Sequence, residues 1–235
     1  MSQVTTPLYA EDSHLKEFDA SVLKSGPKFV VLDQTAFYPE GGGQPSDTGT
    51  LTVEGKIARV IKVIKRGNEI FHYLDADIKT GTTVHGTLDW DKRRWNMRRH
   101  SAEHLLTGLI EADKELPKVY SDLEKLEYIN SNITHDKLKH IEQQFNQIVE
   151  QDLPVKIYQV NRSNLDASND PRKMSFLEKI PRNVETLRMV DIGPYASTFC
   201  FGTHVKSTSD IGKLVSLSLE EGKKGRKVIR FQLRQ

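Results

Sequence analysis

Residues 32–49 read LDQTAFYPEGGGQPSDTG, and this polar, glycine-rich segment interrupts a region that is otherwise typical of β-structure. Pro39 and the run from Gly41 to Gly43 are turn signals. On both sides lie short runs rich in β-branched and aromatic residues, at positions 29–32, 48–53, 58–64, 69–74 and 83–88. Several short strands at close spacing predict a small barrel or sandwich over residues 1–90.

The pattern changes near residue 91, where apolar side chains begin to recur at helical spacing. We predict one helix over residues 94–113 and a second that begins after Thr134, a candidate N-cap. Residues 161–182 show no clear pattern. Strand-like runs occupy 155–160, 187–192, 214–219 and 227–233, and the polar turn 220–226 joins the last two as a hairpin. The chain is therefore expected to be an α+β protein whose second domain covers residues 91–235.

Composition narrows the class of protein. The chain has 235 residues, with 34 Lys and Arg against 32 Asp and Glu, a net charge of +2, 37% hydrophobic and 28% charged residues. These values are typical of a soluble globular protein. The sequence has no apolar run near the length of a membrane span, and no secretory signal is expected at its start. Cys200 is the only cysteine, which excludes an intrachain disulfide and favours the reducing cytoplasm.

Two pairs of potential metal ligands share a spacing of four residues: His100 with His104, and Cys200 with His204. On a helix this spacing places both side chains on one face, close enough to share an ion. Three imidazoles and one thiolate suit Zn²⁺. Four protein ligands would make a closed structural site, whereas three would leave a position for water or substrate. The alternative for the lone cysteine is an inert buried thiol.

The neighbours of the histidine pair distinguish it from two other kinds of site. Both histidines are predicted to point away from the apolar arc centred on Ala102 and Leu109, which favours a ligand role over a core role. The helix of a zinc peptidase needs Glu directly after the first histidine, where it acts as general base. Because Ser101 occupies that position, we exclude a zinc peptidase.

Three motifs follow one another along the chain: the glycine-rich segment 32–49, HSAEHLL at 100–106, and CFGTHV at 200–205 with TSDIG at 208–212. In this combination the chain resembles the editing domain of alanyl-tRNA synthetase. It is most similar to the free-standing relatives of that domain, the AlaX-type alanyl-tRNA editing proteins of medium length. The resemblance extends from about residue 29 to residue 233, which is nearly the whole chain.

The resemblance implies a fold and a reaction. It implies a β-barrel-like domain over residues 1–90, then a two-layer α/β editing domain over 91–235 that binds tRNA. Such proteins act in trans as deacylases, removing serine, and in some members glycine, from mischarged tRNA(Ala). A cytoplasmic protein with a tRNA partner and no membrane partner is expected. The implied cofactor is one Zn²⁺ per chain, held by His100, His104, Cys200 and His204.

Two features qualify what the resemblance implies. Phe201 stands where many relatives have Gly, and its side chain would narrow the approach to the metal. The chain is also too short to include a class II aminoacylation domain beside these motifs, so ATP-dependent charging of tRNA is not expected.

Discrimination by such an enzyme depends on one hydroxyl group, because the serine ester carries it and the correct alanine ester does not. A site that hydrogen-bonds a hydroxyl rejects the analogue that lacks it. Thr35, Gln44 and Thr203 are the candidates for positioning the substrate or a water molecule. The alternative for Thr35 is a strand residue or turn cap, and for the glycine run it is a tight turn.

Contacts to RNA phosphates require clustered cations, since the net charge is nearly balanced. We expect the cluster directly before the histidine motif to contact the acceptor stem; it comprises Lys92, Arg93, Arg94, Arg98 and Arg99. A second cluster occupies the turn 223–227. The alternative for both clusters is a solvated charged face.

Two further functions fit the same residues. The first is a non-catalytic tRNA-binding module in which zinc is purely structural. The second is a metal-dependent hydrolase that acts on another ester or amide. Deacylation of mischarged tRNA above the background rate distinguishes an editing enzyme from the first, and preference for tRNA over free seryl esters distinguishes it from the second.

Overall fold

A computed structural model describes residues 4–112, 118–129, 132–165, 177–178 and 180–235 of the chain. The chain divides into two compact units, residues 1–97 and 98–235. The division falls within the long helix α2 (Trp90–Ile110), whose first residues belong to the first unit. The expected domain boundary, near residue 90, lies at the start of this helix, before the division between the two units at residues 97 and 98.

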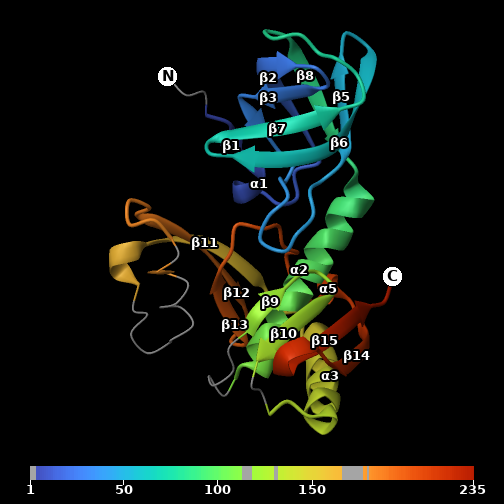
Figure 1. Cartoon of the computed structure of the whole chain (residues 1–235), viewed down its shortest axis with the longest axis vertical. Coiled ribbons are helices and arrows are strands. Elements are labelled where there is room, and N and C mark those ends of the chain that lie inside the picture. The colour runs from blue at the N-terminus through green and yellow to red at the C-terminus, as the bar shows by residue number, and fades with distance from the viewer. Residues whose placement is uncertain (1–3, 113–117, 130–131, 166–176, 179) are drawn as a thin grey trace. The chain divides into compact units, whose positions relative to one another are not determined.

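The first unit is built around a closed antiparallel barrel, as the sequence predicts (Figure 1). Alternate side chains of each strand point inward, and they form one apolar core with Phe37, Leu51 and Val63 among its fully buried members. In spatial order the strands are β2 (Glu17–Gly26), β3 (Phe29–Leu32), β7 (Glu69–Leu74), β6 (Lys56–Arg66), β5 (Gly49–Val53) and β8 (Thr83–Leu88).

A short parallel pair stands beside the barrel strands in the same unit. Strand β1 (Thr6–Pro7) pairs with β4 (Gln34–Thr35), and helix α1 (Leu8–Glu11) follows β1 directly. Thr5 ties this pair to the barrel, because its hydroxyl donates to the carbonyl oxygen of Leu32 at 2.8 Å.

The glycine run forms a tight turn, which is the alternative that the sequence offered for it. Gly41 and Gln44 bond to each other twice, N to O at 3.1 and 3.0 Å. The two residues between them, Gly42 and Gly43, have φ of +58° and +82°. A two-residue loop with positive φ at both positions is a type I′ geometry, which glycine adopts without steric cost.

A buried ion pair anchors the segment that carries this turn. The side chains of Arg93 and Asp47 are both fully buried and pair with each other. Asp47 Oδ2 also accepts a hydrogen bond from the Tyr38 backbone N–H at 2.6 Å, and Arg93 donates to the carbonyl oxygens of Ser13 and Ala36. Because all these groups belong to the first unit, the network fixes both sides of the glycine turn within it.

The second unit contains two antiparallel sheets and three described helices (Figure 1). One sheet has the order β14 (Leu214–Glu221), β15 (Arg226–Leu233), β10 (Lys125–Ile129) and β9 (Lys118–Ser121). The other comprises β11 (Val155–Asn161), β12 (Thr186–Ile192) and β13 (Ala196–Phe199). The helices are the remainder of α2, α3 (His135–Glu150) and α5 (Thr208–Ile211), and single turns of 3₁₀-helix lie at η1 (Arg162–Asn164) and η2 (Lys223–Gly225).

Helix α3 covers one face of the larger sheet, which gives this part of the unit its two layers. Thr134 caps the helix as the sequence predicts, since its hydroxyl accepts from the Lys137 backbone N–H at 3.2 Å. The helix packs against β14, where the Asn146 amide bonds both the N–H and the C=O of Leu214, at 2.9 and 3.1 Å. The predicted hairpin of β14 and β15 is confirmed.

In the part of the chain that the structure describes, no helix combines the length and the apolar character that crossing a membrane requires.

Candidate metal centre

Four potential ligands from two segments of the second unit converge on one point. Helix α2 supplies His100 and His104, and the loop after β13 supplies Cys200 and His204. One donor atom from each lies within 4.8 Å of all the others. Cys200 Sγ is 3.5 Å from His100 Nε2 and 3.4 Å from His204 Nε2, so the sulfur lies between two imidazoles.

The histidine pair is buried, and so are the apolar residues beside it on the helix. His100 and His104 are 4% and 7% exposed, and every residue from 100 to 106 is buried. The helix is therefore enclosed on all sides along these residues, so a helical wheel shows no solvent face here. The backbone near Tyr195 packs closely against the helix at Gly108, because a Cβ at this position would collide with the carbonyl oxygen of Tyr195.

Arg188 on β12 holds the loop that carries the other two ligands. Its guanidinium donates from Nη1 to the carbonyl oxygens of Cys200 at 2.6 Å and of Gly202 at 3.0 Å. The Cys200 N–H in turn donates to the Arg188 carbonyl oxygen at 3.2 Å. The backbone of Cys200 is thus fixed from both sides before any ion is bound.

Ser101 orients the imidazole of His204. The Ser101 hydroxyl is 3.0 Å from His204 Nδ1 and also accepts from the Val205 N–H at 3.3 Å. With Nδ1 held by this hydroxyl, Nε2 is the nitrogen that faces the cysteine sulfur. Holding the second nitrogen of a ligand histidine is how proteins fix the tautomer and direction of the ring.

Glu103 places its carboxylate beside the His104 ring. Its Oε2 is 3.7 Å from His104 Nε2, while its Oε1 accepts from Lys118 Nζ at 2.8 Å and from the Thr107 hydroxyl at 3.0 Å. His104 Nδ1 is buried and has no hydrogen-bond partner among the described residues. An orphaned buried nitrogen is costly in a finished core, and a bound cation would satisfy it.

Burial sets the protonation of the cluster. It lowers the pKa of His100 to about 3 and of His104 to about 4, and it holds the pKa of His204 well below its usual value. The three imidazoles are therefore neutral at pH 7, which is the form that binds metals. Burial also raises the pKa of the Cys200 thiol to about 11, so the thiol keeps its proton until a cation compensates the thiolate charge.

The charge of Glu103 results from opposing effects. Burial by itself would raise the pKa of Glu103, but the charge and hydrogen bond of Lys118 and the nearby His104 bring it down to about 2. The carboxylate is thus ionised at neutral pH and presents a negative charge to the His104 ring. Three neutral imidazoles, one thiol and an adjacent carboxylate fit a divalent cation with a preference for nitrogen and sulfur.

The predicted substrate-positioning residues are divided between the two units. Thr203 is fully buried in the second unit, directly before His204, whereas Thr35 and Gln44 are buried in the first. The Thr35 hydroxyl lies 2.8 Å from His72 Nε2 and accepts from the Phe37 N–H at 3.1 Å. Thr35 thus has the strand and turn contacts that were the alternative to a substrate role.

The predicted RNA-binding cluster is not uniformly accessible. The prediction that Arg93 contacts phosphate is wrong, because its guanidinium is fully buried against Asp47. Arg94 is exposed and Lys92 partly so. In the second unit, Arg98 donates to the carbonyl oxygens of Ile211 and Arg234, and Arg99 pairs with Glu124 at 3.2 Å.

Sequence reasoning missed three residues that support the ligands, namely Ser101, Glu103 and Arg188. The sequence does contain a signal for two of them. Glu103 and Thr107 are four residues apart on a predicted helix, and Arg188 is a lone cation inside the mainly apolar run LRMVDI at 187–192. A charge placed where burial is expected indicates a partner or a site. Ser101 has no such signal.

Phe201 projects into solvent beside the cluster. It is 52% exposed although it follows Cys200 directly. Of the described residues it is one of eight large apolar side chains with high exposure. Its side chain is thus available at the surface next to the ligands.

Comparison with known proteins decides the family. Residues 5–92 match the family of class II (A) tRNA synthetases, and residues 187–231 match the second additional domain of threonyl and alanyl tRNA synthetases. The alanyl-tRNA editing protein AlaX-M of Methanosarcina barkeri is 34% identical over 239 residues, covering 96% of this chain and 98% of that protein. The AlaX-M protein of Methanosarcina acetivorans is 33% identical, with 96% and 98% covered.

The chain belongs to the AlaX-M family of alanyl-tRNA editing proteins. It is also 37% identical to the alanine–tRNA ligase of Pyrococcus furiosus over 227 residues, which are 92% of this chain. It spans only 24% of the length of that ligase. In this AlaX-M family member, Cys200 and His204 lie inside the segment that matches the second additional domain, while His100 and His104 lie outside both matched segments.

Proposed function

We propose that this chain is a free-standing editing hydrolase that removes serine or glycine from mischarged tRNA(Ala). The observation that carries the proposal is the converging cluster of His100, His104, Cys200 and His204, in a chain that AlaX-M proteins match over 96% of its length. The compartment proposed with this substrate is the cytoplasm, where tRNA is charged and used.

The cofactor proposed for the cluster is one Zn²⁺ per chain, held by its three imidazoles and one thiolate. When bound, zinc would supply a Lewis acid that orients a water molecule or the substrate. The chain's own residues prepare the site for it. Ser101 aims the His204 ring, Glu103 places a negative charge beside His104, and Arg188 fixes the loop of Cys200.

Selectivity in this proposal comes from polar side chains that read the serine hydroxyl. Thr203, Gln44 and Thr35 are proposed to position the substrate or the attacking water. All three are buried, and a site that hydrogen-bonds the substrate hydroxyl rejects the analogue lacking it by roughly 10⁴–10⁵. Thr203 is the strongest candidate because it neighbours a ligand of the cluster in the sequence.

Contact with tRNA is proposed for the cations before the histidine motif that are not fully buried. Lys92 and Arg94 extend from the first unit, and Arg98 and Arg99 belong to the second. Cations at these positions would bind backbone phosphates without reading sequence. The buried Arg93 is left out of this set.

The decisive experiment measures deacylation of Ser-, Gly- and Ala-tRNA(Ala) side by side with zinc-loaded protein. We expect the serine ester, the glycine ester or both to be hydrolysed well above background and the alanine ester to be spared. Free seryl esters are included because equal cleavage of them would indicate a general esterase. No rate above background on any tRNA would contradict the editing function.

A second candidate is favoured by one specific observation. All four donors of the cluster lie close together, and a complete set of four protein ligands is typical of structural zinc. The chain would then be a non-catalytic tRNA-binding module. In that case the protein binds tRNA and loses its fold when zinc is removed, but it leaves every ester intact in the same assay.

A further inference from the structure

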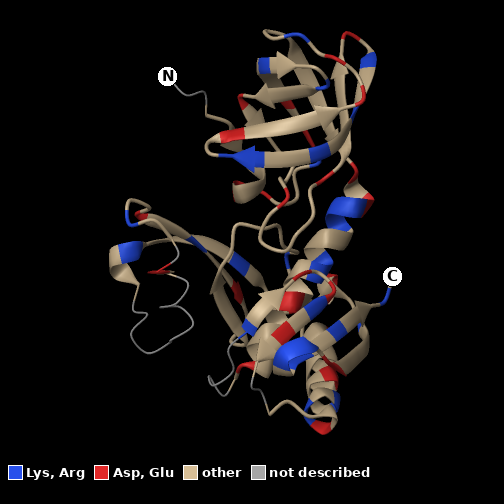
Figure 2. Ribbon diagram, viewed as in Figure 1, with Lys and Arg blue, Asp and Glu red and all other residues tan. Residues whose placement is uncertain are grey.

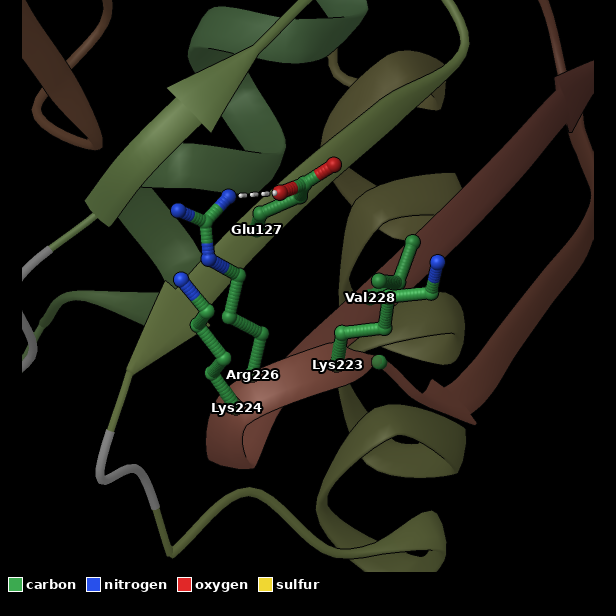
Figure 3. A pocket seen from close by; sticks show the side chains of 6 residues that line it. Glu127, Lys223, Lys224, Arg226 and Val228 are labelled. Carbon is green, nitrogen blue, oxygen red and sulfur yellow. Dashed lines mark hydrogen bonds and ion pairs between the residues drawn. The ribbon is translucent and has the colours of Figure 1, made fainter.

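The turn between β14 and β15 carries a pocket in the second unit that involves none of the metal ligands (Figure 3). Its volume is about 350 Å³, which lies in the range of ligand-binding pockets. The residues that line it are Glu127, Gly222, Lys223, Lys224, Arg226 and Val228. Three of these six are cations and one is an anion.

The single acid of the pocket is already neutralised. Glu127 Oε1 accepts from Lys125 Nζ at 2.6 Å. Its Oε2 accepts from Arg226 Nη1 at 2.8 Å (Figure 3). The carboxylate thus fixes Arg226 in place while its own charge is offset twice. Across the described ranges of the chain, neither Lys223 nor Lys224 has an ion-pair partner, and both are exposed. The pocket therefore presents an excess of positive charge to solvent.

The backbone of the turn holds Lys224 in an uncommon conformation. Its φ of 59° and ψ of 40° lie in the left-handed region, which glycine and asparagine occupy at lower cost. Figure 3 shows the Lys224 and Arg226 side chains extending from the turn toward the same side. Two cations that share one small hollow repel each other, and an anion bound between them would relieve this repulsion.

An exposed aromatic ring lies on the same face of the sheet. Tyr120 on β9 is directly opposite Glu127 on β10, so both side chains point to one face. Tyr120 is 46% exposed, and Lys125 Nζ lies 5.0 Å from the centre of its ring. Exposed aromatic rings beside cations are what unstacked bases bind to, whereas an acidic peptide requires only the charges.

We propose that this surface, the basic turn patch of Lys223, Lys224, Arg226 and Tyr120, docks tRNA through its backbone phosphates and one unstacked base. Figure 2 shows the blue of the basic residues gathered at this turn. The proposal rests on the tRNA partner of the proposed function and adds a contact outside the residues before the histidine motif. A remote contact of this kind holds the tRNA while the ester reacts elsewhere, so it lowers KM rather than raising kcat.

The test is a double charge reversal, Lys223→Glu with Lys224→Glu, in the full-length metal-loaded protein. Both side chains are exposed, so the melting temperature and the zinc content should match those of the wild type. The matched control reverses Lys65 and Lys79, two exposed lysines of the first unit, and has the same net charge. A third variant, Tyr120→Ala, removes only the ring.

Binding of uncharged tRNA(Ala) is measured by fluorescence anisotropy between 50 and 250 mM salt. We expect the turn variant to bind about tenfold more weakly at 150 mM salt, with a salt dependence reduced by about two phosphate contacts. Tyr120→Ala should weaken binding without changing the salt dependence. Wild-type affinity in the turn variant, or an equal loss in the control, would overturn the proposal and leave an acidic protein partner as the better fit.

Deacylation of mischarged tRNA by the same proteins separates the two proposals. If the turn docks tRNA, its reversal raises KM and leaves kcat unchanged. If the wild type binds tRNA but hydrolyses no ester, the proposed editing function is contradicted. The anisotropy measurement would still show whether the turn binds tRNA.

Discussion

At the scale of single residues, the cluster depends on side chains that contact ligands rather than on the ligands alone. Glu103 is the clearest case, because its carboxylate is buried, ionised and 3.7 Å from His104 Nε2. Two donors, Lys118 and Thr107, keep the carboxylate in this position. A negative charge beside a ligand imidazole raises its basicity and its affinity for a cation.

We therefore expect Glu103→Gln to weaken zinc binding by about 10–100-fold, because the amide keeps the shape but loses the charge. The measurement is competition with a chromogenic chelator. Glu150→Gln serves as the control, since Glu150 is an exposed carboxylate on α3 that pairs with Lys213. Equal zinc affinity in the two variants would show that Glu103 does not act on the cluster.

The ligand assignment makes a second prediction at this scale. Cys200→Ser and His104→Ala should each purify with little zinc and lose deacylation in parallel, because each removes one of four converging donors. Metal content by atomic emission and the rate on Ser-tRNA are measured on the same samples. Full activity without bound metal would contradict the assignment.

How much of this site the sequence predicts depends on the kind of residue. The sequence predicts His100, His104, Cys200 and His204 because two pairs of metal-binding side chains with this spacing are rare in one chain, and the spacing has its own geometry. The structure brings these four together as predicted. Ser101 was not assigned a role, since a serine next to a histidine is common. Its contact with His204 spans 103 positions of the chain, and no local pattern encodes that.

At the scale of elements, the glycine-rich segment is held by the start of helix α2. Arg93 and Asp47 are fully buried and bonded to each other, and Arg93 also bonds two backbone carbonyls of the first unit. Removing one partner of such a pair leaves an uncompensated charge in a site that excludes water. The adjacent Arg94 is exposed, which makes it a natural comparison.

Arg93→Ala should lower the free energy of unfolding of the first unit by about 3–5 kcal/mol, whereas Arg94→Ala should change it by less than about 0.5 kcal/mol. Urea denaturation followed by tryptophan fluorescence measures both, because Trp90 and Trp95 both belong to this unit. The affinity for tRNA should change in the opposite order: Arg94→Ala should bind tRNA more weakly than Arg93→Ala, because only Arg94 is exposed. Equal stability of the two variants would mean that the buried pair contributes nothing to the fold.

The strands that the sequence did not predict lack a concentrated run of β-branched and aromatic residues. Strand β2 (Glu17–Gly26) alternates buried Phe18, Ala20 and Val22 with exposed polar residues, so it contains no continuous apolar run. Strands β9 and β10 are short and charged; β10 pairs with the distant strand β15, and β9 pairs with β10. By contrast, β3, β6 and β7 were predicted because β-branched and aromatic residues are concentrated in them.

At the scale of the whole molecule, each unit responds to acid through its own buried groups. In the barrel, burial lowers the pKa of His72 from 6.5 to about 4, against the opposing effect of backbone hydrogen bonds at Val30 and Ile70. The Nε2 atom of the neutral His72 ring lies 2.8 Å from the hydroxyl oxygen of Thr35. The folded barrel therefore resists protonation of a histidine that the unfolded chain protonates readily.

The sign of the effect follows from the number of bound protons. Between pH 6.5 and pH 4 the unfolded chain binds the proton and the folded barrel does not, so stability increases with pH in this window and is lost as pH falls. A pKa lowered to about 4 changes the contribution of His72 to the free energy of unfolding by roughly 3 kcal/mol over the full window, at about 1.4 kcal/mol per pKa unit. Between pH 7 and pH 4.5 we expect a loss of about 2 kcal/mol from this residue.

His72→Gln should remove that part of the pH dependence while lowering stability at pH 7 through imperfect packing. The control is His85→Gln, which replaces a barrel histidine whose side chain is 45% exposed. Urea titrations at pH 7 and pH 4.5, followed by the two tryptophans of the first unit, give the difference directly. If His72→Gln loses as much stability on acidification as the wild type, the acid sensitivity of the barrel arises from other groups. The buried His72 would then be protonated without cost, contrary to its enclosure in the apolar core.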